Sequence, residues 1–141
     1  MRTLLFDASS IMLLAKRNPG TASATLEGQC ILDLTRYELG NAIWRVAKLI
    51  GKSDKPIALE VLEQVHSLMA LMEVLRPEGL EEFNGAMEVA FDVDLCFYDS
   101  SYIQAARRNG LVLVTEDARL MKRAKELGLG CIGVKDTPEV N

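Results

Sequence analysis

The chain has 141 residues, a length that favours one domain with a hydrophobic core of its own. Its apolar fraction is 49% and its charged fraction 26%, as in ordinary globular proteins, and no apolar run approaches the about 20 residues of a membrane helix. The formal net charge of −4 argues against nucleic-acid binding through a broad basic surface. These features predict a cytoplasmic protein with one domain over residues 1–135 and a polar tail over 136–141.

Strand-like apolar runs alternate with helical patterns along the chain. Strands are predicted at 3–6, 29–32, 112–115 and 131–134, with a weaker one at 73–75. Helices are predicted at 10–16, 21–27, 35–50, 79–91, 100–109 and 118–127, and another after a cap at Ser53 or Asp54 with Pro56 in its first turn. Strands separated by helices require crossover connections, so the sequence predicts an α/β fold with a mainly parallel sheet covered on both faces.

Several side chains are expected in the core. The helix at 35–50 has an apolar stripe made of Leu39, Ile43, Val46 and Ile50, and the following helix has one made of Leu62, Val65, Met69 and Met72. Tyr37 and Trp44 are also expected to pack against the protein. The three cysteines are odd in number and lie among apolar residues, which predicts reduced core residues at Cys30, Cys96 and Cys131.

Three apolar runs end on an aspartate: Asp7, Asp99 and Asp117. Helix capping explains each of them singly, because each precedes a helical pattern. The carboxyl ends of parallel strands share one edge of a sheet, so together the three are expected to lie close to one another there. Like charges at such distances repel unless a cation lies between them, and this favours a metal site.

Glu38, at the start of the helix at 35–50, is the fourth candidate acid. Asn41 and Arg45 lie three and seven residues further on, which places them on the same helix face. A ligand set made only of carboxylates favours Mg²⁺ or Mn²⁺ over zinc. The single histidine, His66, is expected to be structural or exposed, and the glycine motifs that bind nucleotide phosphates are absent from the sequence.

With these residues identified, the sequence resembles PIN-domain proteins, and most of all the VapC toxins of prokaryotic toxin–antitoxin pairs. The motifs are "LLFDASS" with Asp7, "LTRYELGNAIW" with Glu38, "FYDSSYIQAARRNG" with Asp99 and "LVTEDARL" with Asp117. The resemblance covers nearly the whole chain and implies a three-layer α/β/α sandwich with a four- or five-stranded, mainly parallel sheet.

The resemblance further implies Mg²⁺- or Mn²⁺-dependent endonucleolytic hydrolysis of RNA, with Asp7, Glu38, Asp99 and Asp117 as catalytic metal ligands. Ser9 and Thr115 match hydroxyl positions near the metal, and Asn41 and Arg45 are candidates for contacting the substrate or supporting the ligands. Of the adjacent acids Glu116 and Asp117, the second is expected to face the site. The family also implies a homodimer and a small antitoxin protein as a partner, with no membrane contact.

Three other readings stay open. A PIN domain can act in RNA processing outside a toxin–antitoxin pair. A receiver-like phosphoryl-transfer domain also gathers acids and Mg²⁺ at strand ends, but it carries paired acids after the first strand, whereas Asp7 is followed by Ala8 and Ser9. The segment "VHSLMALMEVL" is apolar on more than one helical face, which predicts burial in the core or, as a non-catalytic interaction module, a binding surface for a partner.

Overall fold

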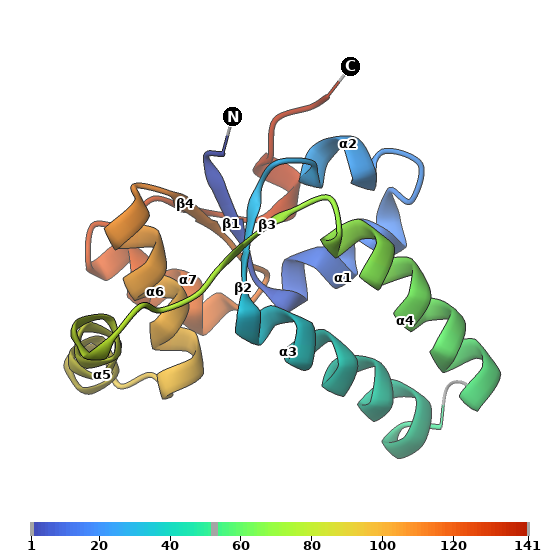
Figure 1. Ribbon diagram of the computed structural model, residues 1–141, viewed down its shortest axis with the longest axis horizontal. Helices are drawn as coiled ribbons and strands as arrows, with labels where there is room; N and C mark the ends of the chain where they lie inside the picture. Colours follow the sequence, from blue (N-terminus) through green and yellow to red (C-terminus); the bar gives the residue numbers. More distant parts are fainter. Residues whose placement is uncertain (1, 52–53, 141) are drawn as a thin grey trace.

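The computed structural model describes residues 2–51 and 54–140, in which five short strands form one sheet (Figure 1). The strands are β1 (Leu4–Phe6), β2 (Cys30–Leu32), β3 (Glu73–Leu75), β4 (Val112–Val114) and β5 (Cys131–Ile132). They lie in the order β3-β2-β1-β4-β5, and every neighbouring pair is parallel. The predicted parallel sheet is confirmed, with a strand in each of the five expected regions.

Helices cover both faces of the sheet. They are α1 (Ala8–Arg17), α2 (Ala22–Leu26), α3 (Asp33–Trp44), the π-helix η1 (Arg45–Leu49), α4 (Lys55–Met69), α5 (Leu80–Val93), α6 (Phe97–Asn109), α7 (Ala118–Glu126) and the short 3₁₀-helix η2 (Val134–Asp136). In Figure 1 the first four α-helices lie on one side of the sheet, and α5, α6 and α7 lie on the other. This is the expected three-layer α/β/α sandwich. None of the helices within the described ranges is both long and apolar enough to cross a membrane.

The core has two halves because side chains alternate between the faces of a strand. On β1, Leu4 and Phe6 join the half under α1–α4, whereas Leu5 joins the half under α5–α7. On the neighbouring strand, Val114 and Leu113 divide in the same way. Burial on both faces is typical of a parallel sheet and fixes the register of these short strands.

The strand order reverses between β1 and β4. From β1 the chain proceeds to β2 and β3 on one side, and β4 and β5 then fill the other side. The residues that follow the two central strands are held beside each other, since the Asp7 N–H donates to the Val114 carbonyl at 3.2 Å. Such a reversal opens a crevice outside the carboxyl ends of the strands, where ligands bind in open α/β sheets.

The start of α4 agrees with its predicted cap at Asp54, whose Oδ1 accepts the Ile57 N–H at 3.2 Å. The alternative cap, Ser53, lies outside the described residues. The apolar face predicted for this helix is correct for Val65 and Met69, but Leu62 is exposed, and Met72 is buried after the end of the helix.

The predicted continuous helix over 35–50 is wrong at its end. The Ile50 N–H bonds to the Arg45 carbonyl, five residues back, so the last turn is a π-helix. This wider turn changes the side of the helix on which the last residues of the predicted apolar stripe lie. Leu39 and Ile43 are buried as expected, while Val46 and Ile50 are exposed. Tyr37 and Trp44 are also exposed, at 77% and 51%, so the expectation that they pack is wrong too.

The apolar run 95–98 does not form a strand. Leu95 is buried in the core, but α6 begins at Phe97, and Cys96 occupies the position before it. Cys96 is therefore exposed, which corrects its assignment to the core; Cys30 and Cys131 are buried as expected. His66 is exposed on α4, as expected.

Candidate functional site

Asp7 lies directly after β1 and begins the site. Its side chain is 6% exposed, and its Oδ1 caps α1 by accepting the Ser10 N–H at 2.9 Å. The same oxygen accepts the Ser9 hydroxyl at 2.8 Å, and Oδ2 accepts the Thr115 hydroxyl. Asp7 is thus both a helix cap and a buried carboxylate with its two oxygens engaged.

Ser9 and Thr115 join the chain after β1 to the chain after β4. The Ser9 Oγ accepts the Glu116 N–H at 3.0 Å, and the Thr115 Oγ1 accepts the Asp117 N–H at 3.0 Å. Each hydroxyl therefore donates to Asp7 and accepts a backbone amide of the segment after β4. These are the two hydroxyl positions that the family resemblance singled out.

The adjacent acids Glu116 and Asp117 point in different directions. Glu116 Oε1 accepts the Val134 N–H at 2.7 Å, which turns this carboxylate towards the chain after β5. Asp117 Oδ1 caps α7 by accepting the Arg119 and Leu120 N–H groups at 2.9 and 3.1 Å. Asp117 is exposed, and its charge raises the pKa of Asp99, so it lies on the side of the other acids.

Asp99 lies in the first turn of α6 and does not cap this helix. The cap is Cys96, whose Sγ accepts the Asp99 N–H at 3.4 Å. The Asp99 carboxylate is half-buried, and a hydrogen bond with the Cys96 side chain lowers its pKa. Capping therefore accounts for Asp7 and Asp117 but leaves Asp99 without a structural role of that kind.

Glu38 lies in the second turn of α3 and is held by a side chain of α6. Its Oε1 accepts the Tyr102 hydroxyl at 2.5 Å, and the Tyr102 oxygen lies 2.7 Å from the Thr35 Oγ1. Neither Thr35 nor Tyr102 was singled out from the sequence. The signal was present, since each lies three residues from a candidate acid on the same helix face.

The acids Asp7, Glu38, Asp99 and Asp117 are close enough to influence one another, and we call them the acidic site. Burial raises the pKa of Asp7, although hydrogen bonds from Thr115, Ser10 and Ser9 counteract it. Burial also raises the pKa of Glu38 and of Asp99. The charges of Asp7 and Asp99 raise the pKa of Glu38 further, and those of Asp117 and Asp7 raise the pKa of Asp99.

The acidic site lacks a basic side chain paired with it in the described part of the chain. Among the residues that the structure describes, none of the four acids forms an ion pair. The charge of Arg119 lowers the pKa of Asp99 slightly, but its guanidinium binds the Asp94 carbonyl at 2.6 Å and the Asp94 carboxylate at 3.5 Å. Clustered carboxylates without a basic partner cost stability, which is tolerated where they serve a ligand.

The acidic site does not form a closed cage. Across residues 2–51 and 54–140, no three His, Cys, Asp or Glu side chains are arranged so that they could hold a metal ion. Hydrogen bonds from Tyr102, Thr115 and the α7 amides hold three of the acids in place, and the assignment of all four as metal ligands stays a prediction. The donor set still fits Mg²⁺, which binds through one or two carboxylates and keeps several waters.

The structure does not join the other two candidates to the acids. Asn41 and Arg45 are exposed, and in the described ranges neither forms a hydrogen bond or ion pair with the acidic site. Arg45 begins the π-helix η1, whose wider turn changes the face on which later side chains lie.

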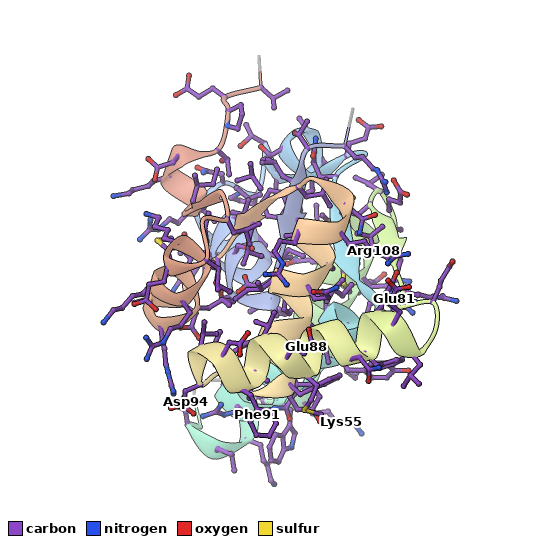
Figure 2. All side chains as sticks on the ribbon, turned by 90° about the vertical axis from the view of Figure 1, so that its left-hand side faces the viewer. Lys55, Glu81, Glu88, Phe91, Asp94 and Arg108 are labelled. Atoms are coloured by element: carbon purple, nitrogen blue, oxygen red, sulfur yellow. The ribbon has the colours of Figure 1, made fainter. Side chains whose placement is uncertain are left out.

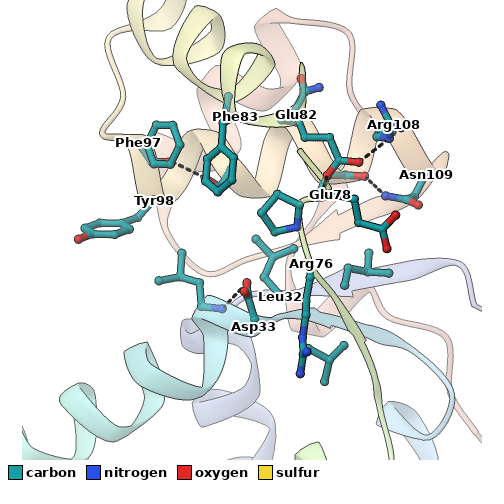
Figure 3. A pocket seen from close by; sticks show the side chains of 18 of the residues that line it. Leu32, Asp33, Arg76, Glu78, Glu82, Phe83, Phe97, Tyr98, Arg108 and Asn109 are labelled. Atoms are coloured by element: carbon teal, nitrogen blue, oxygen red, sulfur yellow. Dashed lines mark hydrogen bonds and ion pairs between the residues drawn. The ribbon is translucent and has the colours of Figure 1, made fainter. Parts of the chain in front are cut away.

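A hollow of about 480 Å³ adjoins the acidic site across α6 (Figure 3). On α6, Tyr98 and Ser101 line this hollow, whereas Asp99 belongs to the acidic site and Tyr102 donates to Glu38. One wall is made by the stacked rings of Phe83 and Phe97, whose centroids are 6.0 Å apart. The hollow and Asp99 thus lie on neighbouring faces of α6.

Figure 3 shows two arginines around the hollow. Arg108 is paired with Glu82 at 2.6 Å, which joins α6 to α5. Arg76 lines the hollow and forms no ion pair within the described part of the chain. The hollow therefore contains an arginine without an ion pair in the described structure and the exposed ring of Tyr98.

Two comparisons with known proteins agree with this architecture, while no protein-family model matches the sequence. Exonuclease VapC9 of Pyrobaculum aerophilum is 38% identical over 121 residues, which cover 86% of this chain and 85% of the relative. A crystal structure of a protein from the same organism superposes with a TM-score of 0.76 at 34% identity, covering 94% of this chain and 90% of the other.

A more distant neighbour is VapBC-1 of nontypeable Haemophilus influenzae, with a TM-score of 0.61 at 15% identity over 96% of this chain and all of the other. A toxin–antitoxin complex from Klebsiella pneumoniae has a TM-score of 0.58 at 13% identity, over 82% and 87% of the two chains. At such identities the likeness is one of fold. The Pyrobaculum relative is similar over most of both sequences, and this chain therefore belongs to the VapC family of PIN-domain proteins.

Proposed function

We propose that this chain is a divalent-metal-dependent ribonuclease, the toxin of a VapBC-type pair. The observation that carries the proposal is the group of four acids: besides burial, Asp7 and Asp99 raise the pKa of Glu38, Asp117 and Asp7 raise the pKa of Asp99, and none of the four forms an ion pair among the described residues. The name of the Pyrobaculum relative, an exonuclease, supports action on nucleic acid. Under this proposal, the net charge of −4 is compatible with an anionic substrate because bound cations reverse the local field.

The proposal gives each side chain a task. Asp99, which is half-buried in the first turn of α6, and the free oxygens of Asp117 and Glu38 would hold Mg²⁺ or Mn²⁺. The Asp7 carboxylate would add a further negative charge that attracts the cation. A bound cation of this kind lowers the pKa of a coordinated water and stabilises the charge that develops on the phosphate. This chemistry requires no histidine, and the single histidine, His66, is exposed on α4.

Ser9 and Thr115 would keep the Asp7 carboxylate fixed and orient the backbone that leads to Asp117. Asn41 and Arg45 stay candidates for contacting substrate phosphate, because both are exposed on the segment that continues from Glu38. The hollow across α6 offers the ring of Tyr98 to an unpaired base next to the scissile phosphate, which favours single-stranded RNA.

The test compares wild type with Asp99→Asn and with Asp92→Asn, an exposed aspartate of α5 without an ion pair in the described chain. We expect RNA cleavage with Mn²⁺ to fall by more than about 100-fold in Asp99→Asn and to persist in Asp92→Asn. A fall of this size is larger than that caused by losing a residue that only supports a metal ligand. Mn²⁺ should also raise the melting temperature of wild type more than that of Asp99→Asn. Equal cleavage by all three proteins would refute the assignment.

Circular and linear forms of one RNA separate two modes of cleavage. We propose endonucleolytic cleavage, so both forms should be cut, whereas an enzyme that requires an end, as the name of the relative suggests, would cut only the linear form. The same sequence as DNA tests the preference for RNA.

A partner protein is part of the proposal. Exposed apolar side chains gather on the segments that contain α3, η1 and α4, at Trp44, Leu49, Ile50, Ile57 and Leu59. A surface of this kind supports a homodimer or a bound antitoxin helix. Light scattering at high concentration tests the dimer, and a small protein encoded directly upstream would favour a toxin over an RNA-processing nuclease. Labelling by acetyl phosphate would instead favour the phosphoryl-transfer alternative.

A further inference from the structure

Tyr102 connects the two helices that carry Glu38 and Asp99. Its side chain is 1% exposed and extends from α6 to α3, where its hydroxyl meets both Thr35 and Glu38. Asp99 lies three residues before it on α6, so the same side chain determines where both acids stand relative to each other.

The hydrogen bonds run in one direction. The Thr35 Oγ1 accepts the Leu32 N–H at 3.1 Å, and an ionised Glu38 can only accept. The Tyr102 hydroxyl proton therefore goes to Glu38, at 2.5 Å, and the Thr35 hydroxyl proton goes to the Tyr102 oxygen, at 2.7 Å. The resulting series of hydrogen bonds leads from the Leu32 backbone amide, at the end of β2, through Thr35 and Tyr102 to the Glu38 carboxylate.

This series has consequences for both Glu38 oxygens. Tyr102 binds Oε1, while no described residue donates a hydrogen bond to Oε2. The carboxylate is thus held at one oxygen and presents the other. Thr35 is fully buried, so the series is anchored inside the core and is protected from competing water.

We propose that Tyr102 is a positioning residue that fixes the Glu38 carboxylate for cation binding, with Thr35 as its anchor; the inference rests on the proposed metal-dependent function. Tyr102 itself touches neither the cation nor the RNA. Its contribution is to keep one Glu38 oxygen engaged and the other directed at the acidic site, as outer-sphere partners do for ligands in metal sites.

The test measures Mn²⁺ affinity by calorimetry, without substrate. Tyr102→Phe removes only the hydroxyl, and we expect the Mn²⁺ dissociation constant to rise by about 10-fold or more. Thr35→Val should raise it in the same direction, and Thr35→Ser should restore it. Tyr37→Phe is the matched control, because Tyr37 is 77% exposed on α3 beside Glu38 and its hydroxyl has no partner in the described structure.

A double-mutant cycle separates positioning from general destabilisation. If Tyr102 acts through Glu38, then Tyr102→Phe added to Glu38→Gln should leave the Mn²⁺ affinity of the single Glu38→Gln variant unchanged. A crystal structure of Tyr102→Phe should show the Glu38 carboxylate in another rotamer.

The outcomes are distinguishable. Wild-type protein that binds no Mn²⁺ would overturn the proposed function itself, and with it the inference. Wild-type binding with an unchanged dissociation constant in Tyr102→Phe, or an equal loss in the Glu38→Gln background, would overturn the positioning role alone. A Tyr102→Phe protein that is less stable but binds Mn²⁺ as tightly as wild type would likewise show that the tyrosine only supports the fold.

Discussion

The Thr115 hydroxyl donates to Oδ2 of Asp7, 108 positions away along the chain. Both side chains are buried, and the bond connects the residues that follow the two central strands. Because Thr115 also accepts the Asp117 N–H, one hydroxyl ties a buried acid to the backbone of a second acid.

Thr115→Val should therefore destabilise the protein although it keeps the shape of the side chain. The substitution leaves Asp7 Oδ2 and the Asp117 N–H without a partner, and the free energy of unfolding should fall by about 1–3 kcal/mol. Urea denaturation at neutral pH measures this change. Thr115→Ser is the control and should retain most of the stability; equal losses in both variants would assign the effect to packing of the methyl group.

The pH dependence of stability follows from the acidic site. The pKa values of Asp7, Glu38 and Asp99 are raised in the folded chain, chiefly by burial, above the ordinary values of 3.8 for Asp and 4.5 for Glu. The folded chain therefore binds these protons more readily than the unfolded chain. The stability that they contribute is fully present below the ordinary values and is lost as the pH rises through the raised ones.

We accordingly expect Asp99→Asn to stabilise the metal-free protein at neutral pH, since it removes a charge that Asp117 and Asp7 repel. The advantage over wild type should shrink as the pH falls through the raised pKa of Asp99. Urea denaturation across this range, with EDTA present, measures it. Asp92→Asn should show no such advantage, and a destabilised Asp99→Asn protein would contradict the electrostatic account.

Most of the fold could be predicted because periodicity and turn residues define it locally. The five strand regions follow from short apolar runs, and the parallel sheet follows from the helices between them. The π-helical turn at Arg45–Leu49 could not be predicted, since its sequence continues an ordinary α-helical stripe. Burial of Cys96 was predicted from its apolar neighbours, but its position before α6 leaves it exposed.

The site was predictable as far as strand ends determine it. Asp7 and Asp117 follow neighbouring strands, so topology alone brings them together. The hydrogen bonds of Tyr102 and Thr35 depend on how α6 packs against α3, and such tertiary contacts leave no local pattern beyond a spacing of three residues. Glu116 could be separated from Asp117 only by its bond to the Val134 amide.

Two neighbouring serines of α6 provide a test of burial. The Ser100 Oγ is buried and lacks a hydrogen-bond partner in the described structure, whereas the Ser101 hydroxyl donates to the Phe97 carbonyl at 2.7 Å. Ser100→Ala should raise the free energy of unfolding by about 1 kcal/mol, because it removes an unsatisfied polar group. Ser101→Ala should not raise it. Thermal or urea unfolding of both variants decides the matter, and a loss of stability in Ser100→Ala would indicate a partner for its hydroxyl.

The hollow beside α6 should affect substrate binding. Tyr98 lines it and is 61% exposed, so Tyr98→Ala removes a ring on which a base can stack. We expect KM for RNA to rise with little change in kcat, equivalent to about 1–3 kcal/mol of binding. Phe91→Ala is the control, because Phe91 is 83% exposed on α5 and does not line the hollow (Figure 2). An unchanged KM in Tyr98→Ala would remove the hollow from the proposed binding path.

The pairing of β1 with β4 has a consequence for synthesis of the protein. The first strand leaves the ribosome long before its partner, and Asp7 acquires the Thr115 hydroxyl only when the chain beyond β4 has emerged. Domains fold as units, so a nascent or prematurely terminated polypeptide lacks the assembled acids. With the proposed activity, such a product could not cleave RNA until translation has passed the final strands.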